Sequence, residues 1–95
     1  MRADVWLWRA RFFKSRSAAS AFVRAGKLRA SSGGETRRVQ RASALVRPGD
    51  VLTFARQDRI ICVRVLSPGL RRGPAREAAG LYEAVDGNEQ PERGA

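Results

Sequence analysis

Basic and hydroxyl side chains alternate in the short stretch Lys14-Ser15-Arg16-Ser17, which precedes the alanine-rich segment 18–25. Cations beside hydroxyls and a helix N-terminus are typical of a phosphate-binding site, because they combine charge with hydrogen-bond donors. An arginine can also hold one phosphate through two parallel hydrogen bonds. The stretch therefore indicates binding of a polyanion through its phosphates.

The net charge of +10 is concentrated in the N-terminal part of the chain. Residues 1–41 contain eleven basic and two acidic residues, whereas residues 42–95 contain eight and seven. A genome biased toward arginine would explain why 17 of the 19 basic residues are arginine, but it would not explain this asymmetry. Such a distribution favours nucleic acid as the partner.

The sequence lacks the patterns that are typical of catalysis and metal binding. It has no histidine, no glycine-rich phosphate loop after a strand and no paired carboxylates at a useful spacing. Cys62, the single cysteine, lies in the apolar run 60–63 and is expected to be a small core residue. We therefore expect no enzyme activity, no metal, no cofactor and no small-molecule substrate.

Nothing in the sequence indicates a membrane protein. The apolar run 60–63 is far shorter than the roughly 20 residues that span a bilayer. Residues 1–4 lack the charged and then apolar layout of a signal peptide. We expect one small cytoplasmic domain that acts as a monomer.

Two helices are expected to position the basic stretch. Residues 3–13 carry two apolar stripes at helical spacing, so this first helix needs cover on two sides. A second helix is expected from a cap at Ser15 or Ser17 to about Ala25, and Gly26 suits its left-handed end. The stripes of the first helix are Ala3, Leu7 and Ala10, and Val5, Trp8 and Phe12.

After Gly26 the sequence changes to the alternation that is typical of strands. Pro48 and Gly49 suit the two central positions of a type II turn. A helix is expected from about Ala75 to Val85, and the polar residues 86–95 are expected to be disordered. The fold class is therefore α+β, with two helices packed on a small antiparallel sheet of short strands, plus a C-terminal helix. The expected strands lie near residues 27–30, 38–40, 51–54 and 60–66.

The aromatic residues Trp8, Phe12 and Phe13 leave two interpretations open. Rings that lie among cations can stack on unpaired bases. Aromatic residues at helical spacing in a small domain are more often part of the core. We favour the core, with Leu81 and Tyr82 of the C-terminal helix as part of its cover.

Together these residues resemble the RNA-binding domain first recognised in the fourth protein of the small ribosomal subunit, the S-four-type domain. That family has Arg-x-Asp at its first helix, Ser-Arg at its second, a glycine after it and a later Gly-Asp turn. The resemblance implies that the two-helix RNA-binding motif and the following strand form the RNA face. The matching features here are Arg2-Ala3-Asp4, Ser15-Arg16, Gly26 and Gly49-Asp50.

The stretch WLWRARFFKSRS and the segment RRGPAREAAGLYE extend this resemblance to the stand-alone, ribosome-associated heat-shock family known by its fifteen-kilodalton mass. It implies binding to ribosomal RNA of the large ribosomal subunit, and rescue or recycling of stalled subunits that carry peptidyl-tRNA under stress. The tRNA is a further candidate partner. A general binder of RNA or DNA, without a single ribosomal target, is the alternative. The implied division is an S-four-type domain at 1–66, an extension at 67–85 and a tail at 86–95.

Carried over by position, the resemblance assigns RNA binding to residues around the two helices and the first strand. Arg37 and Arg38 extend this surface, whereas Arg47 and Arg56 fall outside it. The expected RNA-binding residues are Arg2, Arg9, Arg11, Lys14, Ser15, Arg16, Arg24, Lys27, Arg29, Arg37 and Arg38.

Overall fold

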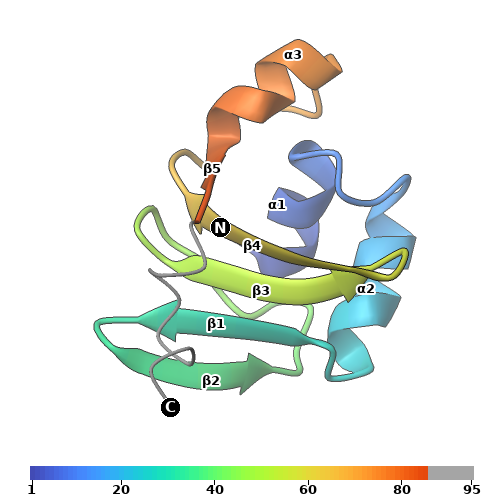
Figure 1. The fold of residues 1–95 in the computed structure, drawn as a ribbon. Coiled ribbons are helices and arrows are strands. Elements are labelled where there is room, and N and C mark those ends of the chain that lie inside the picture. The colour runs from blue at the N-terminus through green and yellow to red at the C-terminus, as the bar shows by residue number, and fades with distance from the viewer. Residues whose placement is uncertain (86–95) are drawn as a thin grey trace.

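A computed structural model describes residues 1–85 as a five-stranded antiparallel sheet with two helices on one face (Figure 1). The elements are α1 (Ala3–Arg9), α2 (Arg16–Arg24), β1 (Leu28–Ser32), β2 (Glu35–Val39), β3 (Val51–Arg56), β4 (Arg59–Val65), α3 (Ala75–Ala78), the 3-10 helix η1 (Ala79–Leu81) and β5 (Tyr82–Ala84). The strand order is β2-β1-β3-β4-β5. In Figure 1, α1 and α2 lie behind the sheet and α3 lies beyond its β5 edge. The α+β class predicted from the sequence is confirmed.

The helix α1 is shorter than the sequence predicts, and its buried face contains a residue that the expected stripes leave out. Trp6 and Leu7 are fully buried, at helical spacing from the buried Ala3 and Ala10. The helix ends after seven residues, and Arg11 then takes a positive φ of 67°. This left-handed residue turns the chain out of the helix, because it is not compatible with a further helical turn.

The three aromatic residues expected in the core differ in environment. Phe13 is buried, and Phe12 is half-buried and packs against the main core. Trp8 is also half-buried, but it does not pack against the main core, and the guanidinium carbon of Arg72 lies 5.9 Å from its ring centroid. The core interpretation is confirmed for the two phenylalanines and wrong for Trp8, because Trp6 occupies the position that faces the sheet.

The helix α2 and the turn before β3 form as the sequence predicts. The Ser15 hydroxyl caps α2 by accepting a hydrogen bond of 3.0 Å from the helix backbone. Gly26 follows the helix with a φ of 77°. Gly49 has a φ of 97°, and the N–H of Asp50 donates to the carbonyl of Arg47 over 3.0 Å, which closes the turn. Local residue preferences are sufficient to define these features.

The C-terminal helix expected from Ala75 to Val85 is wrong beyond Leu81. Its last residues form β5 instead, with Tyr82 opposite Val65 and Ala84 opposite Val63 of β4. Without β5, β4 would present unpaired backbone groups at the edge of the sheet. Backbone pairing with β4 therefore replaces helical hydrogen bonds in this segment.

Cys62 is buried, as the sequence predicts, but it lies outside the main core. It forms a small separate cluster with Val51 and Val85. Its strand neighbours Ile61 and Val63 alternate with it toward the helix-covered face, where Val63 joins the main core. The cluster therefore lies on the sheet face opposite the helices.

The segment before β3 fixes the start of α1. The N–H of Ala3 donates to the carbonyl of Ala44 over 2.8 Å, and the N–H of Asp4 donates to that of Ala42 over 3.2 Å. These bonds satisfy two donors that the first turn of a helix leaves unpaired. The N-terminal end of α1 is thereby held against the rest of the domain.

Within residues 1–85, no helix has the length and apolar character needed to cross a bilayer. No cluster of three or more His, Cys, Asp or Glu side chains in this part of the chain could hold a metal ion. Residues 86–95, for which the sequence predicts disorder, lie outside the described residues.

Candidate nucleic-acid interface

A shallow hollow of about 330 Å³ lies between the start of α1 and α2. Three guanidinium groups, two hydroxyls and one carboxylate line it. Three of these side chains recur every fourth residue along α2 and therefore share one stripe of the helix. The residues of this α2 hollow are Arg2, Asp4, Arg16, Ser17, Ser20 and Arg24.

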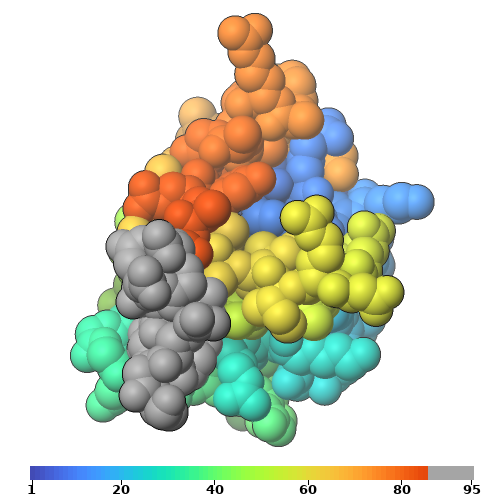
Figure 2. Space-filling model, in the orientation of Figure 1, coloured from blue at the N-terminus to red at the C-terminus, as the bar shows by residue number. Residues whose placement is uncertain are grey.

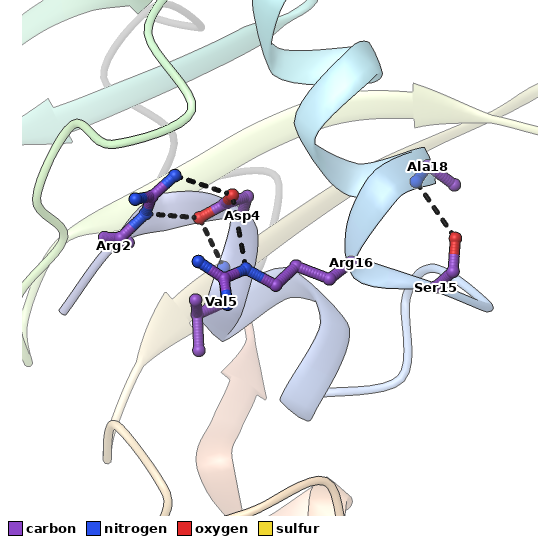
Figure 3. A network of polar contacts seen from close by, with 6 residues as sticks. All are labelled: Arg2, Asp4, Val5, Ser15, Arg16 and Ala18. Atoms are coloured by element: carbon purple, nitrogen blue, oxygen red, sulfur yellow. Dashed lines mark hydrogen bonds and ion pairs between the residues drawn. The ribbon is translucent and has the colours of Figure 1, made fainter.

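The carboxylate of Asp4 holds two of these arginines in position (Figure 3). It is 2% exposed and accepts two hydrogen bonds of 3.1 Å from the guanidinium of Arg2. It also accepts the N–H of Val5 over 2.8 Å and forms an ion pair of 3.7 Å with Nε of Arg16. Burial of an unpaired carboxylate raises the free energy of the folded state, so pairing with Asp4 holds the guanidinium groups of Arg2 and Arg16 close to the same carboxylate. The sequence had indicated Asp4 only as part of the Arg-x-Asp motif at the first helix.

The first turn of α2 adds backbone donors to the hollow. The hydroxyl oxygen of Ser15 accepts the N–H of Ala18, so it acts as a helix cap. Within residues 1–85, the N–H groups of Arg16 and Ser17 donate no hydrogen bond. They lie at the positive end of the helix dipole. The start of α2 therefore offers the donors and the charge that a phosphate group needs.

A second group of expected residues lies at the C-terminal end of α2 and on the β1–β2 hairpin. Arg29 and Arg38 are directly opposite each other in the antiparallel pair, where like charges repel. Arg37 belongs to the other face of the sheet, because successive strand residues alternate. Lys27 is exposed next to β1, and none of these four forms an ion pair with residues 1–85.

Two expected RNA-binding residues, Arg9 and Arg11, instead attach the C-terminal extension to α1. Arg9 donates from Nη1 to the carbonyl of Gly69 over 2.7 Å, and Arg11 donates from Nε to that of Gly73 over 2.6 Å. Arg72 of the extension in turn donates from Nε to the carbonyl of Trp8 in α1 over 3.1 Å. The structure therefore places these two arginines away from the α2 hollow.

The same extension has an ion pair of its own. Arg71 donates from Nη2 to a carboxylate oxygen of Glu77 over 2.8 Å. This hydrogen bond and the charge of Glu77 raise the pKa of the Arg71 guanidinium. Both side chains are exposed and lie outside the α2 hollow.

Several residues that line hollows were absent from the expected set. Ser17 and Ser20 line the α2 hollow. Ser20 could have been predicted from the sequence, because it follows Arg16 by four residues and therefore lies on the same side of the helix. Arg56, which the sequence placed outside the binding surface, lines a second hollow together with Lys14. Arg56 and Lys14 line the same hollow because the β3–β4 hairpin contacts the loop after α1. The residues adjacent to either one in the sequence do not indicate this contact.

No protein-family model matches the chain. Heat shock protein 15 of Escherichia coli is 33% identical over 85 residues, which cover 87% of this chain and 59% of the relative. A heat shock protein 15 homolog of Haemophilus influenzae is 32% identical over 88 residues, which cover 90% of this chain and 62% of the relative. A trimeric structure of Vibrio cholerae heat shock protein 15 covers the whole chain and 92% of its own, with a TM-score of 0.81 and 29% identity.

In both sequence and fold, this chain resembles heat shock protein 15. The resemblance inferred from the sequence is confirmed. The chain spans about three fifths of the length of the curated relatives it matches. In this heat-shock-protein-15-like domain, the Arg-x-Asp motif is the hydrogen-bonded pair of Arg2 and Asp4, and the Ser-Arg motif is the cap and first residue of α2.

Proposed function

We propose that this domain binds structured RNA through the α2 hollow and that the RNA belongs to the large ribosomal subunit. The observation that carries the proposal is the buried carboxylate of Asp4, which positions Arg2 and Arg16 beside unpaired N–H groups of α2. Phosphate groups are recognised through such sets of charged and backbone donors. The crowding of positive charge into residues 1–41 supports the same conclusion.

Basic residues lie both along the α2 hollow and on the β1–β2 hairpin. Arg16 and Arg24 are eight residues apart, a span of about 12 Å along α2. The opposed pair of Arg29 and Arg38 lies on the sheet face away from the helices, because its strand neighbours Leu28 and Ala30 are buried in the main core, and an anion between the two guanidinium groups would stabilise it. A surface of this extent suits the backbone of a folded RNA better than a single small anion.

For the role in the cell, we propose that the protein binds stalled large subunits that carry peptidyl-tRNA and helps to rescue or recycle them under stress. The likeness to heat shock protein 15 supports the link to stress, and the resemblance stated from the sequence supports the ribosomal target. The protein acts in the cytoplasm as a binding protein, without an enzymatic step or a cofactor. Contact with the tRNA is part of this proposal.

Sedimentation of a cell lysate through a sucrose gradient tests the proposed target. The wild-type protein is expected to co-migrate with free large subunits. Arg16→Gln combined with Arg24→Gln should release it to the top of the gradient. Arg47→Gln combined with Arg76→Gln removes the same charge from exposed arginines outside the α2 hollow and should leave co-migration intact. A spread over all nucleic acid would favour the alternative, a general nucleic-acid binder.

We further propose that the monomer is the active form. The Vibrio cholerae heat shock protein 15 structure is trimeric, so a monomer and a trimer are the two states to distinguish, and they differ in mass. Equilibrium ultracentrifugation at the concentration used for RNA binding distinguishes them. A mass of one chain supports the proposal, and a mass of three chains contradicts it.

A further inference from the structure

A second hollow, of about 700 Å³, lies between the loop after α1, the β3–β4 hairpin and β5. In Figure 2 it lies where the blue N-terminal segment, the yellow hairpin and the orange C-terminal segment meet. Its lining combines basic side chains with aromatic rings, and we call it the aromatic groove. Of the RNA-binding residues expected from the sequence, Lys14 and Arg11 line this groove, and Arg11 also donates to the C-terminal extension.

Among residues 1–85, the charged side chains that line the aromatic groove all have one sign. Five of them are basic, and none of the described lining residues is a carboxylate. Within residues 1–85, Lys14 and Arg59 have no hydrogen-bond or ion-pair partner, while Arg56 lies 4.2 Å from the centroid of an aromatic ring. Arg11 and Arg72 donate to backbone carbonyls, which orient them without neutralising their charge. A cluster of this kind favours an anionic ligand.

The groove also contains two partly exposed aromatic rings. Phe12 and Tyr82 are half-buried, and their ring centroids are 4.8 Å apart. Phe54, 5.3 Å from Phe12, and Trp6, 6.4 Å from Tyr82, support them from the core. The Tyr82 hydroxyl makes no hydrogen bond within residues 1–85. A supported pair of rings beside cations suits a ligand that has both a flat ring and a negative charge.

We propose that the aromatic groove binds an unpaired nucleotide of an RNA strand, with its phosphate at Lys14 and Arg59 and its base against Tyr82, whose ring packs on Phe12. The volume lies within the range of about 300–1,000 Å³ typical of small-molecule sites, which admits one nucleotide and excludes a duplex. Bases within a duplex are stacked on each other, so only an unpaired base can reach the rings.

This inference rests on the proposed RNA-binding function. Lys14 lines the groove and stands two residues before Arg16, which lines the α2 hollow. A folded RNA held by the α2 hollow can therefore place an unpaired strand in the groove. The two sites would together recognise a junction between paired and unpaired RNA.

The test compares a short fluorescein-labelled uridine strand with the same strand lacking its central bases, by fluorescence anisotropy with the full chain. We expect the intact strand to bind at least about fivefold more tightly, because stacking of a base on an aromatic ring contributes about 1–3 kcal/mol. Tyr82→Ala should abolish this preference, and Tyr82→Phe should retain it. Equal binding of both strands by the wild-type protein would overturn the proposal.

A pair of charge variants tests the phosphate contacts. Lys14→Gln combined with Arg59→Gln should make the dependence of log K on log salt less steep by about 0.7, because one single-strand phosphate contact contributes about that much. Arg47→Gln combined with Arg76→Gln is the matched control and should leave the slope and the base preference unchanged. Equal effects of the two pairs would mean that a general positive field attracts the strand, which contradicts a groove site.

Two competitors and a second RNA distinguish the remaining outcomes. If uridine monophosphate displaces the strand as well as unlabelled strand does, at equal phosphate concentration, the groove is a site for free nucleotides. If a polyglutamate peptide displaces the strand equally well, the groove binds an acidic protein. Either result contradicts the proposal. A ribosomal RNA hairpin should bind the Tyr82→Ala variant about as tightly as the wild type, and it should bind Arg16→Gln with Arg24→Gln about thirtyfold more weakly. Retained hairpin binding without a base preference would overturn the groove alone, whereas failure of the wild type to bind the hairpin would overturn the proposed function.

Discussion

The two ends of α1 contain arginines that look equivalent in the sequence and have different environments in the structure. At the N-terminal end, Arg2 pairs with the buried Asp4 at the edge of an open hollow. At the C-terminal end, Arg9 and Arg11 donate to backbone carbonyls of the extension. An arginine whose donors are directed at the main chain holds two segments together, whereas one at the edge of a hollow keeps donors for a ligand. The partner of an arginine, more than its charge, determines its role.

The largest expected effect is on stability, at the C-terminal end of α1. Arg9→Met combined with Arg11→Met removes two hydrogen bonds from charged donors and leaves the carbonyls of Gly69 and Gly73 unpaired. Such bonds contribute about 1.5–3 kcal/mol each when buried, and partial exposure reduces this, so we expect a decrease of about 3 kcal/mol in the free energy of unfolding. Urea denaturation measures it.

The RNA affinity of this variant, measured while it is folded, should stay within about twofold of the wild type. Arg47→Met combined with Arg76→Met is the control for a general decrease in charge and should change neither quantity. A stable variant that no longer binds RNA would contradict the structural role and return both arginines to the RNA surface.

A smaller effect, on binding, is expected around the α2 hollow. Arg16→Gln combined with Arg24→Gln should weaken the affinity for a ribosomal RNA hairpin about thirtyfold, which corresponds to roughly 2 kcal/mol. The salt dependence should become less steep by about two units, one for each phosphate group that the variant no longer neutralises. The free energy of unfolding should change by no more than about 0.5 kcal/mol, because Arg2 still pairs with Asp4. Filter binding at several salt concentrations provides the test.

Asp4→Asn should change both the free energy of unfolding and the RNA affinity, because Asp4 both stabilises the start of α1 and positions the arginines. The amide lacks the charge that pairs with Arg2 and Arg16, so we expect a decrease of about 1.5 kcal/mol in the free energy of unfolding. RNA affinity should fall only a few-fold, because both cations remain. If affinity rose instead, Asp4 would be acting chiefly by repelling phosphate, and positioning would not be its role.

The smallest effect separates capping from ligand binding. Ser15→Ala should lower stability by about 1 kcal/mol, the usual contribution of a serine cap, and leave the RNA affinity of the folded protein unchanged. Ser20→Ala, in the α2 hollow, should do the reverse and weaken binding with little change in stability. Thermal melts and hairpin titrations of both variants decide between the two roles. Weaker binding by a fully stable Ser15→Ala variant would show that this hydroxyl contacts RNA.

Local sequence was sufficient to predict the parts of the fold whose hydrogen bonds join residues close together in the chain. The Ser15 cap joins positions three residues apart, and Gly26 and Gly49 supply the positive φ values that their turns need. The position of α2, the turn before β3 and the crowding of basic residues around α2 follow from such short-range preferences. The α+β class and the S-four-type likeness rest on the same features.

Only the tertiary structure decided which element or side chain each remaining segment meets. Residues 82–84 form a strand because β4 has an open edge, and Trp6 replaces Trp8 in the core because α1 turns that side to the sheet. Arg9 donates to a carbonyl 60 positions away, and Arg56 and Lys14 line the same groove although 42 positions separate them in the sequence. The physical reason is range: a helix cap or a turn is determined by a few neighbouring residues, whereas the partner of an arginine depends on how distant segments pack.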